Sequence, residues 1–275
     1  MHHAEREAEE RLDTGHNRTS VIIYEQPLNE RIRGLLRIEF LFSAIATRLI
    51  GQSEWDSRAV LSCTIEVTDI LSRYDIKADL IKELERHYAL LVRLQTSPEV
   101  DAMRLNETIS RLNRLLTTLK DPLCQPGQTF RRDELVNAIK QRSGIPGGTC
   151  NFDMPAYHYW LNCPAKVRID QLNRWLEDLR IVEEGVAMTL KLVRESATPM
   201  DAIAPDGFYH RTLEPSGACS LIRIAIPREQ GLFPEISAGK HRFTLRFMEQ
   251  PNTSERPVQT NRDVKFELHL CALTP

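Results

Sequence analysis

The sequence predicts an α+β protein in which a mainly α-helical domain is followed by a smaller domain of antiparallel β-strands. Up to about residue 200, apolar residues recur at steps of three and four, the period of amphipathic helices. Beyond that point short runs alternate apolar with polar residues and are separated by Gly, Pro, Asn and Ser, which is typical of strands. A chain of 275 residues, 41% of them hydrophobic, can bury such cores without disulfides or metals. We therefore expect a helical domain over residues 21–200 and a strand domain over 201–275.

The N-terminal part of the chain contains two different segments. Residues 1–20 are polar and show no regularly spaced apolar face, so we expect a disordered extension. The run Val21-Ile22-Ile23-Tyr24 resembles a strand, and we expect residues 21–25 to join the edge of the later sheet. Pro27 then falls near the first turn of a helix, where its missing N–H costs nothing. This junction would connect the two domains.

The helix that begins near Pro27 has two distinct faces. At 100° per residue, one apolar stripe is formed by Leu28, Ile32, Leu35, Phe42 and Ala46. The opposite face carries Glu30, Arg33 and Arg37, so the helix presents a cationic surface. Glu39 lies on the apolar stripe, where an unpaired carboxylate would cost several kcal/mol. We expect Glu39 to form a structural ion pair rather than to act as a catalytic acid.

The helical spacing continues through most of the first 196 residues. The predicted helices cover Trp55–Tyr74, Ala78–Thr96, Leu105–Leu119, Arg131–Arg142 and residues 165–196, the last with a break near Arg180 or Gly185. Short connections would join them into antiparallel layers. Asp153 is the expected N-cap of a further short helix that has Pro155 in its first turn.

Four runs in the C-terminal part predict one antiparallel sheet. They cover Phe208–Leu213, Cys219–Ile226, Arg242–Met248 and Val264–Leu270. Arg242 and Arg246 are four residues apart, so on a strand both side chains point to the same side of the sheet.

Charge and cysteine usage restrict the function classes. With 36 basic against 38 acidic residues, the chain has no strongly basic overall field, so an anion-binding site must be a local patch. The six cysteines contain no CxxC pair, which suits reduced thiols better than disulfides or a zinc site. No run approaches the roughly 20 apolar residues that span a bilayer, and no secretory leader is recognisable. We expect a cytoplasmic protein.

No catalytic or metal-binding signature is convincing. Cys150, Asp153 and His158 are the one cluster that hints at a thiol enzyme, but their spacing does not place the imidazole beside the sulfur. A metal site from Cys150, His158 and Cys163 lacks the short paired spacings that zinc prefers. The turn at residues 144–149 lacks the lysine of a phosphate loop and contains a proline. We expect no catalytic residue, no metal and no cofactor.

Arginines from separate parts of the chain are the remaining candidates. They are Arg33, Arg37, Arg73, Arg131, Arg132, Arg242 and Arg246. Together they would form a cationic groove, and arginine is suited to binding carboxylates through two hydrogen bonds. Two hypotheses follow from this groove. One is a site for an acidic protein segment, and the alternative is a nucleic-acid-binding module with a steep dependence on salt.

Several long motifs, in order, resemble the ZapD family of bacterial cell-division proteins. They are YEQPLNERIRGLLRIEF, LIKELER, IPGGTCNFDMPAYHYWL, DGFYHR and PEISAGKHRFTLRFM, and the resemblance covers residues 21–273. It implies a non-enzymatic homodimer with an α-helical and a β-strand domain. Such proteins bind the C-terminal tail of the tubulin-like protein FtsZ and cross-link its filaments at midcell, which supports assembly of the Z-ring.

The resemblance also implies which residues bind the tail. They are Arg33, Arg37, Arg73, Arg131, His158, Arg242 and Arg246. One departure affects this surface, because relatives read R-E-D-R where this chain has Arg131-Arg132-Asp133-Glu134. Glu134 is therefore acidic where those relatives are basic, and Arg132 restores the local charge.

Overall fold

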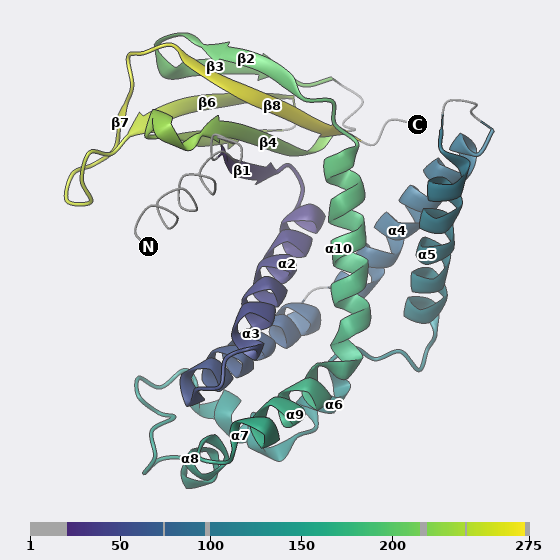
Figure 1. The fold of residues 1–275 in the computed structure, drawn as a ribbon, viewed down its shortest axis with the longest axis vertical. Helices are drawn as coiled ribbons and strands as arrows, with labels where there is room; N and C mark the ends of the chain where they lie inside the picture. The colour runs from purple at the N-terminus through teal and green to yellow at the C-terminus, as the bar shows by residue number, and fades with distance from the viewer. Residues whose placement is uncertain (1–20, 74, 97–99, 215–218, 240, 273–275) are drawn as a thin grey trace, which may run out of the picture. The chain divides into compact units, whose positions relative to one another are not determined.

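The computed structural model describes residues 21–73, 75–96, 100–214, 219–239 and 241–272 (Figure 1). The expectation for residues 1–20 lies outside this range. The described chain forms two compact units, a helical unit of residues 29–196 and a sheet unit of residues 21–28 and 197–272. The predicted α+β class is confirmed, with helices in the N-terminal part and antiparallel strands in the C-terminal part.

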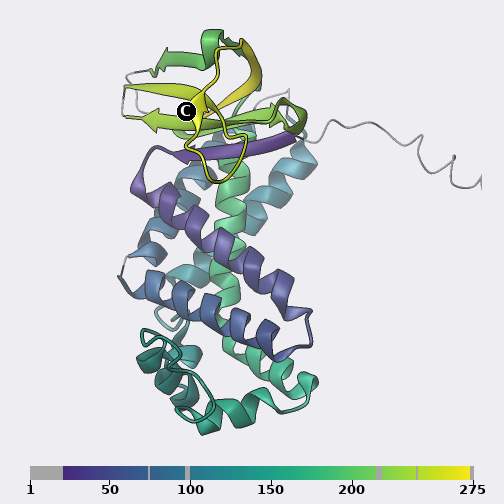
Figure 2. The same ribbon diagram turned by 90° about the vertical axis from the view of Figure 1, so that its left-hand side faces the viewer.

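The helical unit is built from long helices that pack side by side. In chain order its elements are α2 (Glu30–Leu49), α3 (Glu54–Arg73), α4 (Ile76–Leu94), α5 (Ala102–Lys120), α6 (Gln128–Arg131), α7 (Glu134–Arg142), α8 (Pro155–Leu161), α9 (Ala165–Leu176), the 3-10 turn η1 (Glu177–Leu179) and α10 (Arg180–Glu195). α2 packs on α3 and α4 on α5, while α10 contacts α2, α4 and α5. Figure 2 shows α2 and α3 lying one below the other, joined by a short turn.

The start of α2 differs from the prediction. Pro27 is the last residue of strand β1 (Val21–Pro27), and the helix begins at Glu30. Asn29 is the N-cap, and its side-chain oxygen accepts a hydrogen bond of 2.9 Å from the N–H of Ile32. The amide side chain of Asn29 satisfies a free helix donor, which a proline cannot do, so the helix begins directly after the asparagine.

The buried face of α2 is broader than the predicted stripe. It consists of Ile32, Leu35, Ile38, Leu41, Phe42 and Ile45. Ala46, predicted on the stripe, is exposed, and Leu28 packs in the sheet unit instead. The reason is that α2 is covered by both α3 and α10, so more than one stripe is buried. Glu39 has the predicted ion pair, since its two carboxylate oxygens accept hydrogen bonds of 2.7 Å from Arg194 on α10.

Two further helix boundaries also differ. The predicted helix Arg131–Arg142 is divided between α6 and α7, because Asp133 caps the N–H groups of Leu135 and Val136. Asp153 is not the N-cap of α8; Met154 holds that position, and the Asp153 carboxylate accepts from Arg142 and Cys150 instead. The long last helix is broken at η1, close to the predicted Arg180. The hydrogen bonds of the two aspartates account for both differences, because Asp133 caps α7 while the Asp153 carboxylate is engaged away from α8.

The sheet unit contains two antiparallel sheets rather than the single sheet predicted. One has the order β1-β4-β8-β2, with β4 (Cys219–Pro227), β8 (Val264–Ala272) and β2 (Met200–Ala204). The other has the order β3-β6-β5, with β3 (Phe208–Thr212), β6 (Arg242–Glu249) and β5 (Leu232–Ala238), and β7 (Val258–Gln259) pairs with β6. Side chains of both sheets share one core that includes Ile224, Phe243, Phe247 and Phe266.

Strands β2, β5 and β7 were not predicted from the sequence. They are short or lie at sheet edges, where the alternation of apolar and polar residues is weakest. β2 and β5 are edge strands, and β7 has only two residues. β5 contains Pro234, which an edge strand accepts because one row of N–H groups faces away from the ladder. β1 forms the opposite edge of the first sheet, where Val21 to Pro27 pair with β4.

A buried histidine makes the stability of the helical unit dependent on pH. His87 on α4 is 2% exposed, and burial lowers its pKa to about 4, with Glu83 opposing and Arg86 assisting the shift. Its Nε2 atom has no hydrogen-bond partner within the described chain. The unfolded chain therefore binds the proton more tightly than the folded chain, so stability is lost as pH falls from about 6.5 towards 4.

We expect the free energy of unfolding to drop by about 2 kcal/mol between pH 7 and pH 5 through His87 alone. Urea unfolding followed by far-UV circular dichroism at both pH values measures this loss. The His87→Leu variant is the control, because it cannot titrate at that position and should lose about 2 kcal/mol less than the wild type over the same interval. If the wild type and His87→Leu lost the same free energy of unfolding between pH 7 and pH 5, His87 would not be the group responsible for the pH dependence.

Candidate partner-binding surface

Two of the predicted arginines lie on the exposed side of α2. Arg33 forms an ion pair of 2.8 Å with Glu30, in the first turn of the same helix. Arg37, one turn further along, is exposed, and no described residue forms an ion pair with it. Exposed pairs such as Arg33 with Glu30 contribute little to stability, so Arg33 can exchange Glu30 for another carboxylate at small cost. Arg37 needs no such exchange.

The start of α4, just after Arg73, packs closely on α2. Gly34 lies between the two arginines, and a Cβ atom added there would stand 3.0 Å from Ile76 Cδ1, so the start of α4 packs directly on α2. Arg73 is the last residue of α3, three positions before Ile76, and it is exposed. Arg73 is therefore three residues from the point at which α4 contacts α2.

Arg131 lies beside the same end of α3. Its Nη2 atom donates to the carbonyl of Pro126 at 3.0 Å, and it lines a hollow of about 420 Å³ together with Ser72 and Lys77. Gly127, with a φ of 75°, allows this loop to approach Thr68 on α3. Arg73 and Arg131 thus both lie at the C-terminal end of α3, while Arg33 and Arg37 are presented by α2.

His158 is not part of this junction. It is exposed on α8, and its ring nitrogens lie 3.5 Å from Asn162 Nδ2. The neighbouring Tyr157 stacks under the guanidinium of Arg58, 4.8 Å from its ring centre. Arg58 precedes Arg73 by 15 residues, about 22 Å along α3. The structure therefore places His158 towards the opposite end of α3 from the arginines.

Arg242 and Arg246 belong to the sheet unit. Along β6, Phe243, Leu245 and Phe247 are buried, while both arginines are exposed, so they lie on the same outer face as predicted. No described residue forms an ion pair with either of them. They are presented by a regular strand, which holds them in a defined spacing.

Glu134 has a structural role where the sequence motif departs from relatives. It is the first residue of α7 and is exposed, where a negative charge is favourable near the helix N-terminus. The neighbouring Asp133 caps the helix and accepts a hydrogen bond of 2.9 Å from Trp175 Nε1. Arg131 and Arg132, both exposed, keep two positive charges beside this helix start.

The thiol cluster is not arranged as a nucleophile and base. Cys150 Sγ lies 3.3 Å from the Asp153 carboxylate, whereas the His158 ring is paired with Asn162. Burial raises the pKa of the thiols of Cys63, Cys124 and Cys219, which keeps them protonated near neutral pH. Within the described ranges, no group of three or more His, Cys, Asp or Glu could hold a metal ion.

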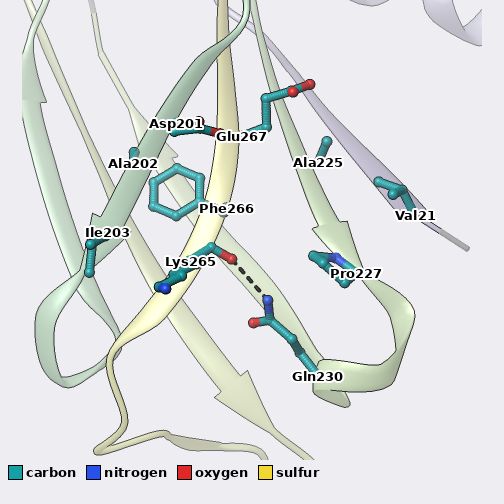
Figure 3. Close-up of a pocket in the computed structure, with 10 residues that line it drawn as sticks. All are labelled: Val21, Asp201, Ala202, Ile203, Ala225, Pro227, Gln230, Lys265, Phe266 and Glu267. Carbon is teal, nitrogen blue, oxygen red and sulfur yellow. Dashed lines mark hydrogen bonds between the residues drawn. The ribbon is translucent and has the colours of Figure 1, made fainter. Parts of the chain in front are cut away.

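A hollow lies on the outer face of the first sheet, over strands β1, β2, β4 and β8. Its volume is about 750 Å³. Figure 3 shows its side chains spread over the strands, with aliphatic residues such as Val21, Ile203 and Ala225 and the polar groups of Asp201 and Lys265. None of its ten lining residues is a serine, cysteine or histidine. None of the helices that the structure describes has the length and apolarity to cross a membrane.

The fold and the exposed arginines on α2 and β6 are those of an α+β binding protein. In the described residues, Arg37, Arg242 and Arg246 form no ion pair with the rest of the chain. Comparison with known proteins identifies the family. Residues 36–246 match the family model described as ZapD, cell division protein, and the chain belongs to this family. The family assignment gives the chain a role in cell division.

Relatives are similar over nearly the whole chain. The chain is 38% identical to the cell division protein ZapD of Methylococcus capsulatus over 252 residues, which cover 92% of this chain and 98% of the relative. It is also 38% identical over 253 residues to ZapD of Aromatoleum aromaticum, with the same two shares. The ZapD of Coxiella burnetii is 32% identical over 255 residues, covering 92% of this chain and 99% of the relative.

Proposed function

We propose that this protein binds the acidic C-terminal tail of FtsZ and cross-links FtsZ filaments at the division site in the cytoplasm, without catalysing a reaction. The observation that carries the proposal is a set of exposed arginines without ion pairs in the described chain. They are Arg37 and Arg73 in the helical unit and Arg242 and Arg246 in the sheet unit. Family membership, with its role in cell division, supports the choice of partner.

The proposed tail-binding residues are the seven that the family resemblance implies. They are Arg33, Arg37, Arg73, Arg131, His158, Arg242 and Arg246. Each guanidinium can form two parallel charge-assisted hydrogen bonds with one carboxylate. Because these groups are exposed, salt screens them over about 8–10 Å, so binding weakens as ionic strength rises.

Cross-linking requires more than one tail site in each particle. A homodimer with two-fold symmetry presents the same surface twice, so it can hold tails from two filaments. Along two parallel polymers each bound tail raises the effective concentration of the next, and weak individual contacts can bundle filaments.

The test is co-sedimentation with FtsZ polymerised by GTP, using full-length FtsZ and a version without its C-terminal tail. We expect this protein to pellet with bundled filaments only when the tail is present. Pelleting with both versions would move the site away from the tail, and pelleting with neither would contradict the proposed partner. Binding to duplex or single-stranded DNA at low salt, with a steep salt slope, would favour the alternative of a nucleic-acid-binding module.

A further inference from the structure

The outer face of the second sheet carries more than the two arginines. Residues on β3, β5 and β6 alternate between the shared core and this face, as expected for strands. Tyr209 points inward, with its ring centre 5.3 Å from that of Phe266. The outward positions are Phe208, His210, Thr212, Phe233, Glu235, Ser237, Arg242, Thr244, Arg246 and Met248. The rings of Phe208 and His210 therefore share a face with Arg242 and Arg246, with which no described residue forms an ion pair.

The strand register places Phe208 beside Arg246. The two residues are directly opposite each other in the β3–β6 pair, so their Cβ atoms are about 5 Å apart. Phe208 is 40% exposed, and its ring stacks on that of His210 with centres 6.0 Å apart and planes at 28°. His210 is opposite Thr244, which lies between the two arginines along β6. The stacked rings of Phe208 and His210, here called the aromatic platform, therefore lie on β3 beside the strand β6 that carries Arg242 and Arg246.

Arg246 has different neighbours on its two flanks. On β5 its direct partner is Glu235, an exposed acidic residue, whereas on β3 it is Phe208. A carboxylate that approaches Arg246 is repelled by Glu235 and is favoured on the β3 side. The residues next to that carboxylate in a bound peptide then lie over the rings of Phe208 and His210.

We propose that Phe208 and His210 bind an apolar or aromatic side chain of an acidic peptide whose carboxylates bind Arg246 and Arg242. The proposal rests on the proposed function and specifies the chemistry of the tail that this site accepts. The two arginines are about 13 Å apart along β6, the length of four residues of extended chain. The peptide that fits is therefore extended, with separated carboxylates and an apolar residue beside one of them.

This arrangement separates two contributions to binding. The arginines supply charge-assisted hydrogen bonds that salt weakens, while the aromatic platform buries apolar surface that salt does not screen. Binding by arginines alone would accept any acidic segment. The platform selects segments in which an apolar side chain lies next to a carboxylate, and it should keep part of the affinity at raised ionic strength.

The experiment measures fluorescence anisotropy of a labelled peptide with the sequence of the FtsZ C-terminal tail, with the full-length protein. We expect Phe208→Ala to weaken binding roughly tenfold, because it removes most of one aromatic side chain from the contact. The matched control is Ile203→Ala, which removes an exposed apolar side chain from the outer face of the other sheet and should leave affinity unchanged. A second peptide, with apolar residues replaced by serine and carboxylates kept, should bind the wild type and Phe208→Ala equally.

The outcomes separate this inference from the proposed function. If Arg246→Glu weakens binding of the tail peptide but Phe208→Ala binds like the wild type, the platform is overturned and the partner is retained. If the wild type does not bind the tail peptide, both are overturned. If single-stranded DNA binds to this face and Phe208→Ala abolishes that binding while the peptide is unaffected, the platform belongs to a nucleic acid and the peptide assignment is wrong.

Discussion

Charge reversal at Arg37 and Arg246 together is expected to lower the affinity for FtsZ filaments by at least about 100-fold and to abolish bundling. Each guanidinium supplies charge-assisted hydrogen bonds of about 1.5–3 kcal/mol, and a glutamate at the same position adds repulsion of an acidic tail. Both side chains are exposed, so the folded structure should be unchanged. Co-sedimentation with FtsZ measures the loss, and far-UV circular dichroism checks the fold.

The matched control reverses two exposed arginines outside the proposed surface, Arg104 on α5 and Arg228 after β4. This control changes the net charge of the protein by the same amount. A difference between the two double variants therefore reports on the position of the arginines and not on the net charge. We expect this control to bundle filaments like the wild type. Equal losses in both double variants would mean that bundling depends on net charge only, and no loss in either would contradict the arginine surface.

The single variants Arg37→Glu and Arg246→Glu carry a further result. Arg37 belongs to the helical unit and Arg246 to the sheet unit. Comparing the sum of the single losses with the loss of the double variant tests whether the two reversals act independently. Additive losses would indicate that they do.

Replacement of Arg168 by alanine is expected to destabilise the helical unit by about 3–5 kcal/mol, because several buried acceptors lose their donor. Arg168 is 6% exposed, and its guanidinium donates to the carbonyls of Gln52, Leu161 and Cys163 and to Ser57 Oγ over 2.5–3.0 Å. Alanine would leave these acceptors without donors. The planar fork of arginine reaches all four acceptors at once, so lysine should restore only part of the stability.

Urea unfolding followed by far-UV circular dichroism measures this loss, because the signal reports mainly on the helical unit. Lys166→Ala is the control, since Lys166 is an exposed basic residue on the same helix and should change stability by less than about 0.5 kcal/mol. A similar small change for Arg168→Ala would show that water replaces the guanidinium at these carbonyls.

Much of the candidate site could be predicted from local patterns. The exposed side of α2 and the common face of Arg242 and Arg246 follow from periods of 3.6 and 2, which depend only on neighbouring residues. Phe208 was missed as a site residue, although the same alternation places it on the polar face of its strand. The signal that could have identified it is an aromatic residue at an outward position, but its neighbour Arg246 depends on the pairing of β3 with β6.

The fold class, the order of helices and strands, and the need of Glu39 for a cationic partner can all be inferred from the sequence alone. Those features depend on local periodicity and on the cost of burying a charge. The three-dimensional structure was needed to show that the partner of Glu39 is Arg194, 155 residues away, and that the strands form two sheets. It was also needed to show that His158 on α8 lies beside the N-terminal end of α3, whereas Arg73 is at the C-terminal end of that helix. Contacts between distant residues depend on how whole elements pack, and no short window of sequence contains that information.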